Sequence, residues 1–151
     1  MVEFAFDNKS YTAGAVRVIV CATNAIKCEK FCSDKELKSL KDSIKTEDFK
    51  AEFGTFAGIF DGKNKIILAG TGVKPSLNDV QILGGKIYQR IKNFQNAEIL
   101  VTSNAKAKIS AADLAFNLAF GIELGGYSFD KYFTTKNSSD FPKLEKVHFC
   151  A

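Results

Sequence analysis

The chain is poor in the residue types that carry most metal and nucleophilic chemistry. Its 151 residues include one histidine, His148, four cysteines and no tryptophan. Hydrolysis requires a nucleophile with a base, or several carboxylates around metal ions, and one histidine in a terminal strand-like segment supplies neither. We therefore interpret His148 as a structural residue and expect no catalytic, cofactor-binding or metal-binding residue in this chain.

The cysteines, Cys21, Cys28, Cys32 and Cys150, are too few and too unevenly spaced for a disulfide scaffold. Cys28 and Cys32 have three residues between them, which raises the question of a zinc pair. No matching second pair exists, so we expect four reduced thiols that bind no metal. No charged and then apolar leader opens the chain, and we expect a cytoplasmic protein.

Long hydrophobic runs are also missing. The longest, Leu114 to Leu124, is interrupted by polar residues and is too short to span a bilayer, which excludes a membrane span. Hydrophobic residues make up 46% of the chain and charged residues 25%, values typical of a globular protein. At this length we predict a single domain over residues 1–151, with a core rich in the 14 phenylalanines.

The net charge of +4 comes from scattered lysines. Solvated helix faces explain this charge more simply than DNA binding does, and DNA binding stays open as an alternative.

Strand and helix signals alternate along the chain. Three capping boxes, Ser33 to Glu36, Ser76 to Asp79 and Ser110 to Asp113, each predict the start of a helix. The link Asp61 to Asn64 is too short for a helix and predicts an antiparallel hairpin. The predicted strands cover residues 2–6, 15–21, 55–60, 65–70, 97–102 and 144–150. The sum is an α/β fold with a mixed sheet of about six strands and helices on both faces.

The helix that begins at Ser110 is apolar on most sides. Leu114, Leu118 and Ile122 share one face. A neighbouring face carries the apolar residues Phe116, Phe120 and Leu124. Such a helix is expected to be covered on most sides, by the sheet below it and by a second domain or subunit above it, and to be the most buried helix. We expect it to end at Gly125-Gly126.

The segment Gly70-Thr-Gly72-Val-Lys-Pro75 is the best candidate for a ligand site. Glycines after a strand can open backbone amides and a helix N-terminus to a phosphate. The third glycine of a dinucleotide fingerprint is missing, however, and Lys74 precedes the helix. An ordinary strand-to-helix turn is the simpler interpretation.

One string carries a family resemblance: Gly121-x-x-Leu124-Gly125-x-Tyr127-x-Phe129-Asp130-x-Tyr132. Together with Gly70-Thr-Gly72 and Gly84-Gly85 earlier in the chain, it resembles the non-catalytic N-terminal domain of the leucyl aminopeptidase (cytosol aminopeptidase) family. The resemblance covers nearly the whole chain. Phe120 departs from it, since relatives often have an acidic residue there.

The resemblance implies an accessory domain with a macro-domain-like fold in a homohexameric, cytosolic leucyl aminopeptidase. It places two divalent metals, zinc or manganese, in a C-terminal catalytic domain that would follow residue 151. The family's signature Asn-Thr-Asp-Ala-Glu-Gly-Arg is absent here, so this chain alone is expected to be inactive. Some members also bind DNA. The alternative is a stand-alone macro-domain-like module that binds an ADP-ribose-like ligand at Gly70 to Pro75, or nucleic acid.

Overall fold

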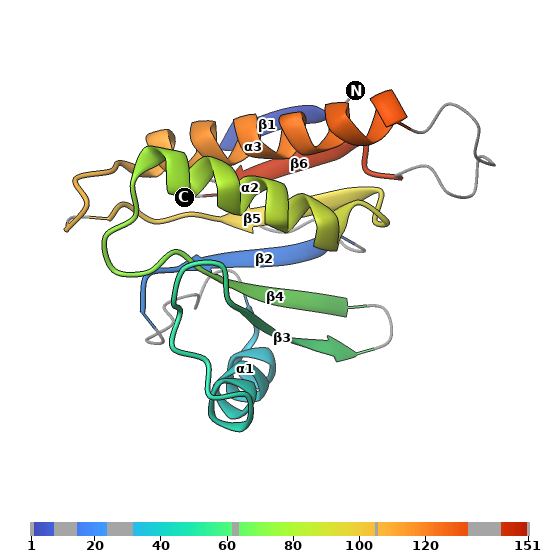
Figure 1. The fold of residues 1–151 in the computed structure, drawn as a ribbon. Helices are drawn as coiled ribbons and strands as arrows, with labels where there is room; N and C mark the ends of the chain where they lie inside the picture. The colour runs from blue at the N-terminus through green and yellow to red at the C-terminus, as the bar shows by residue number, and fades with distance from the viewer. Residues whose placement is uncertain are drawn as a thin grey trace.

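The computed structural model describes residues 2–7, 15–23, 32–61, 64–104, 106–132 and 143–150. Within these ranges the chain forms six strands and three helices (Figure 1). In chain order they are β1 (Glu3–Asp7), β2 (Val16–Cys21), α1 (Asp34–Thr46), β3 (Phe56–Asp61), β4 (Asn64–Gly70), α2 (Leu77–Ile91), β5 (Asn96–Leu100), α3 (Ala111–Tyr132) and β6 (Lys146–Cys150).

The described strands form one mixed sheet in the order β1-β6-β5-β2-β4-β3. Five of them are parallel to one another. Strand β3 alone runs antiparallel, against β4, with Asp61 opposite Asn64. The predicted mixed sheet and the predicted hairpin are therefore confirmed.

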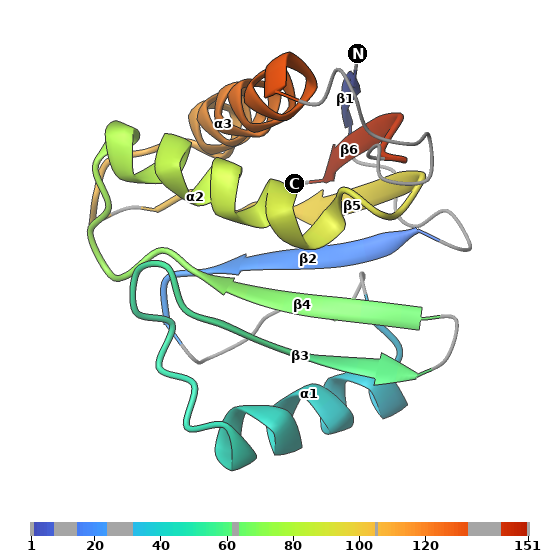
Figure 2. The same cartoon turned by 45° about the vertical axis from the view of Figure 1, so that its right-hand side comes forward.

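Helices cover both faces of the sheet, as the sequence predicted. Helices α2 and α3 lie on one face and α1 lies on the other (Figure 2). The alternation of β2 explains this, because Val16, Val18 and Val20 enter the core beneath α2 and α3. Ile19, on the opposite side of the same strand, packs with Leu40 of α1.

The expected phenylalanine-rich core is wrong. Among the described residues only Phe49 and Phe149 are buried, and the largest fully buried side chains are Tyr88, leucines, isoleucines, Glu98 and Val16. Parallel strands buried on both faces favour branched aliphatic side chains, and these fill the space instead. Several phenylalanines lie at the surface.

Helices α2 and α3 pack so closely that their backbones touch. A Cβ added at Gly84 would lie 2.4 Å from the carbonyl oxygen of Leu118, and one added at Gly121 would lie 2.0 Å from that of Gln81. Real Cβ atoms do not approach backbone oxygens so closely. The close approach predicted at Gly84-Gly85 is therefore confirmed, and the element that approaches is α3.

The predicted end of α3 at Gly125-Gly126 is wrong, because the helix continues to Tyr132. Both glycines lie against the ring of Tyr88 in α2. An added Cβ at Gly125 would be 3.2 Å from Tyr88 Cδ2, and at Gly126 it would be 3.6 Å from Cε1. These glycines make room for a neighbouring aromatic ring instead of ending the helix.

All three predicted helix starts are present. The capping boxes at Ser33 and Ser76 are complete, with both the hydroxyl and the carboxylate bonded to backbone amides. At the third start, the Asp113 amide donates to the Ser110 hydroxyl over 3.1 Å. Local sequence signals thus place the start of every described helix.

Candidate functional site

The Gly70 to Pro75 turn, the candidate ligand site, is covered by another segment of the chain. The Gly72 amide donates to the carbonyl of Ala51 over 2.8 Å. A Cβ added at Gly70 would lie 2.4 Å from the carbonyl oxygen of Glu52. The backbone at Gly70 is therefore occupied by residues 51 and 52, and the glycines serve this packing.

The start of α2, which follows the turn, is also poorly suited to an anion. The Asp79 carboxylate accepts from the Ser76 amide over 3.0 Å, and the Asp79 amide donates to the Ser76 hydroxyl over 3.1 Å. A carboxylate beside the helix N-terminus repels a phosphate that would use the same partial positive charge. This geometry supports the interpretation of the segment as a strand-to-helix turn.

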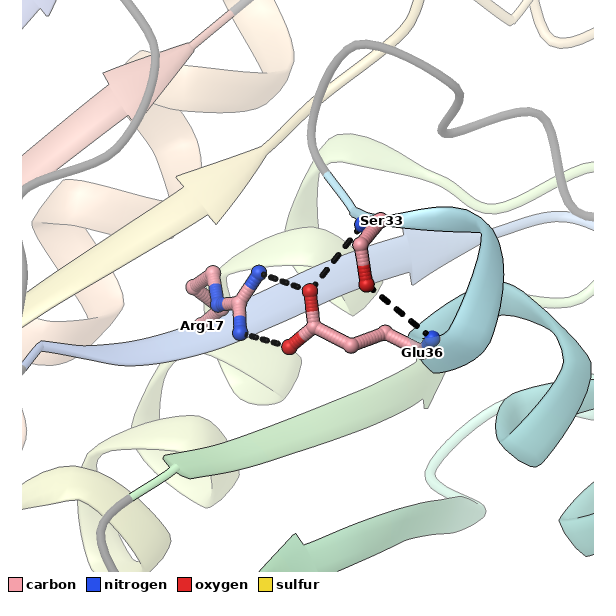
Figure 3. A network of polar contacts seen from close by, with 3 residues as sticks. All are labelled: Arg17, Ser33 and Glu36. Atoms are coloured by element: carbon pink, nitrogen blue, oxygen red, sulfur yellow. Dashed lines mark hydrogen bonds and ion pairs between the residues drawn. The ribbon is translucent and has the colours of Figure 1, made fainter.

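A partly buried ion pair joins β2 to α1 (Figure 3). The Arg17 guanidinium donates to both carboxylate oxygens of Glu36, with Nη1 to Oε1 at 3.2 Å and a shorter Nη2 to Oε2 contact. The Arg17 side chain is 4% exposed and that of Glu36 is 23% exposed. The Ser33 amide donates to the same Oε1 over 3.0 Å, so one carboxylate caps α1 and holds it to the sheet.

The pair changes the acidity of Glu36. The hydrogen bond from Arg17 lowers the pKa of the Glu36 carboxyl below its ordinary value, and this outweighs the opposing effect of burial. The ionised form of Glu36 is therefore favoured in the folded protein, and this form compensates the buried guanidinium. The sequence shows both residues, but only the fold brings them together.

Strand register places Arg17 in a row of ionisable side chains. Arg17 lies opposite Glu98 of β5, and Glu98 lies opposite His148 of β6. Arg17 and Glu98 are 3% and 2% exposed, and His148 is half-buried. Buried charges need partners of opposite sign close by, and the register sets the acid Glu98 between Arg17 and His148. It supports a structural role for His148, and Glu98 is a buried acid that the sequence patterns do not single out.

The remaining candidate acids do not converge on a site. Asp113 and Glu123 are exposed on α3, while the side chain of Asp130 lies outside the described part. Across the described ranges, no group of three or more histidine, cysteine, aspartate or glutamate side chains is arranged to hold a metal ion.

Three of the four cysteines, Cys21, Cys32 and Cys150, are buried in the core beneath α1. Cys28 lies outside the described residues. The structure therefore does not test whether Cys28 and Cys32 could share a metal ion, and reduced, metal-free thiols stay a prediction.

One face of α3 is apolar and exposed. Phe116, Phe120 and Leu124 are 71%, 43% and 49% exposed, whereas Leu118 and Ile122 are fully buried. Over residues 111–126 the helix is no more buried than α2, so the expectation of a most buried helix is wrong. The predicted cover exists on the sheet side of α3, and no described segment of this chain covers the outer side.

With these features in place, comparison with known proteins decides the family. The sequence profile of the N-terminal domain of the cytosol aminopeptidase family matches residues 22–136. The chain belongs to this family. The resemblance inferred from the glycine and aromatic pattern is thus confirmed.

Two curated relatives indicate how much of a family member the chain represents. It is 38% identical over 78 residues to a probable cytosol aminopeptidase of Rickettsia bellii, which covers 50% of this chain and 16% of the relative. It is 30% identical over 119 residues to one of a Sulfurihydrogenibium species, which covers 74% of this chain and 24% of the relative. The chain therefore spans a quarter or less of these aminopeptidases.

Solved structures share the fold. A tomato leucine aminopeptidase mutant superposes over 100% of this chain and 32% of its own, with a TM-score of 0.75 at 20% sequence identity. The bottromycin maturation enzyme BotP, solved in complex with Mn, superposes over 92% of this chain and 27% of its own, with a TM-score of 0.59 at 18% identity. The fold is that of the matching regions of these enzymes.

None of the described helices is both long enough and apolar enough to cross a membrane.

Proposed function

We propose that this chain is the accessory N-terminal domain, residues 1–151, of a metal-dependent aminopeptidase whose catalytic domain follows it in the same polypeptide. The match to the N-terminal domain of the cytosol aminopeptidase family carries this proposal. The curated relatives, of which the match covers 16% to 24%, are named as aminopeptidases and support it. No residue of this chain is proposed to be catalytic, metal-binding or cofactor-binding.

The chemistry of peptide hydrolysis supports this division of labour. Activation of water against an amide at neutral pH needs a Lewis acid or a positioned base. A two-metal site needs several carboxylates around ions about 3.5 to 4 Å apart. Apart from the buried Glu98, which alone among these acids lies inside the sheet, the acids with described side chains cap helices, pair with Arg17, or face solvent. We therefore assign two divalent metals, zinc or manganese, to the catalytic domain, and the removal of N-terminal residues such as leucine to the whole protein.

Assembly is the second part of the proposal. We propose that the whole protein is a cytoplasmic homohexamer, as the family resemblance implies, and that this domain contributes contacts rather than chemistry. We propose that binding of duplex DNA contributes little to the function, since the net charge of +4 comes from scattered lysines.

The test compares the 151-residue chain with the longer polypeptide. Both are purified and incubated with leucine p-nitroanilide and either manganese or zinc. We expect turnover by the longer polypeptide alone, and its loss on treatment with a chelator. Turnover that follows the 151-residue chain through a sizing column would show that this region is catalytic. An inactive longer polypeptide would instead defeat the proposed aminopeptidase function.

A further inference from the structure

The outer side of α3 carries an apolar surface that its own fold does not use. The side chains of Phe116, Phe120 and Leu124 follow one another at intervals of four residues, so they lie on one side of the helix and form a stripe, here called the α3 stripe. Figure 2 shows α3 at the outer edge of the helix layer, with α2 on one side of it. Leu118, on the sheet side, is fully buried.

We propose that the α3 stripe is the docking surface for the remainder of the same polypeptide, an inference that rests on the proposed function above. We expect the partner surface that docks on the α3 stripe to be apolar at its centre and to carry basic side chains at its rim. The size and the charge of the stripe each favour this occupant over a second copy of the chain.

The size of the stripe favours a tethered partner. A phenylalanine side chain buries about 150 to 250 Å² when fully covered, so the exposed parts of the three side chains offer roughly 300 Å². A stable interface between separate proteins buries about 800 Å² on each partner. A domain on the same chain needs less, because the tether holds it at an effective concentration in the millimolar range.

The charge around the stripe disfavours self-association. The side chains of α3 are described over residues 111–126, where Asp113 and Glu123 lie exposed beside the stripe and no lysine or arginine occurs. In a symmetric dimer formed through the stripe, both copies would bring these carboxylates to the same contact. Like charges at a contact lower affinity, whereas lysine or arginine at the rim of another surface would raise it.

Cysteine labelling tests the proposal directly. Phe116→Cys is introduced into the 151-residue chain and into the longer polypeptide, and the rate of modification at position 116 by N-ethylmaleimide is followed by peptide mass spectrometry. Phe60→Cys in β3 is the matched control, because Phe60 is 68% exposed and Phe116 is 71% exposed. We expect labelling at position 116 to be at least tenfold slower in the longer polypeptide, and labelling at position 60 to change less than twofold.

Each outcome separates the docking from the proposed function. Equal labelling of position 116 in both forms, with an active longer polypeptide, would overturn the docking and leave the aminopeptidase function standing. Slow labelling in an inactive longer polypeptide would support the docking and defeat that function. A second experiment measures the oligomeric state of the 151-residue chain by sedimentation equilibrium. A dimer that Phe116→Ser abolishes would overturn the tethered occupant in favour of a second copy, and a monomer would support the proposal.

Discussion

Gly121→Ala tests whether the backbone contact between α2 and α3 holds this fold together. The new methyl group would lie 2.0 Å from the carbonyl oxygen of Gln81 and 3.1 Å from Cα of Gly84. Both are backbone atoms of a packed helix, so no side-chain rotation relieves the overlap. Helix α2 must instead move away from α3, which also stretches the 2.8 Å hydrogen bond between Gln81 and Asn117.

Two opposing effects determine how much Gly121→Ala changes the free energy of unfolding. Replacing glycine by alanine inside a helix stabilises it by about 0.8 to 1 kcal/mol. Overpacking a core costs about 1 to 3 kcal/mol, and a contact with rigid backbone belongs at the upper end. We expect a net loss of about 2 kcal/mol, which lowers the melting temperature of a chain of this size by about 4 to 8 °C.

Gly85→Ala is the matched control, since it is the same substitution one residue from Gly84 on α2. Its new methyl group would meet only the Gly121 carbonyl oxygen at 3.8 Å, an ordinary contact. We expect it to raise stability by about 0.5 to 1 kcal/mol. Both variants are compared with the parent by urea and thermal unfolding, followed by circular dichroism. If Gly121→Ala stabilised the chain as much as Gly85→Ala, the proposed close packing of the two helices would be refuted.

Two further substitutions test the core and the ion pair between Arg17 and Glu36. Leu118→Asp puts an unpaired charge at a fully buried position, and we expect the free energy of unfolding in urea to fall by about 4 kcal/mol. Phe116→Asp, at an exposed position of the same helix, is the control and should cost less than about 1 kcal/mol. Similar losses in the two variants would contradict the assigned faces of α3. Glu36 has a lowered pKa, so its contribution is present above its unfolded value of 4.5 and is lost as the pH falls through the folded value. We expect Glu36→Gln to flatten the acid side of the stability profile, measured from pH 6 to pH 3, and an unchanged profile would show that the pair contributes nothing.

Local signals in the sequence predicted what depends on neighbours in the chain. A serine followed three residues later by an acid marked the described helix starts, and the short link between Asp61 and Asn64 gave the antiparallel hairpin. These signals work because the interacting groups lie within four residues of one another. No long-range information is needed to read them.

Features that depend on contacts across the fold were not predictable in the same way. Arg17, Glu98 and His148 are separated by tens of residues, and only the strand register places them in one row. A charged residue inside an apolar strand signals a buried partner, but it does not say which acid supplies it. The pairing of Arg17 with Glu36 therefore needed the position of α1 as well as the sheet.

The glycines show that residue type alone does not predict the structural role of a position, because that role depends on which distant segment packs against it. At Gly125 and Gly126 a helix stop was expected, yet the ring of Tyr88 occupies the space that side chains would fill, and the helix continues. At Gly70 a ligand cradle was considered, yet the backbone of Ala51 and Glu52 occupies it. In each case a missing side chain admits a segment distant in the sequence. At Phe116 the situation is the opposite, because a large apolar side chain is present and no described segment covers it. We therefore expect its partner to lie outside this domain.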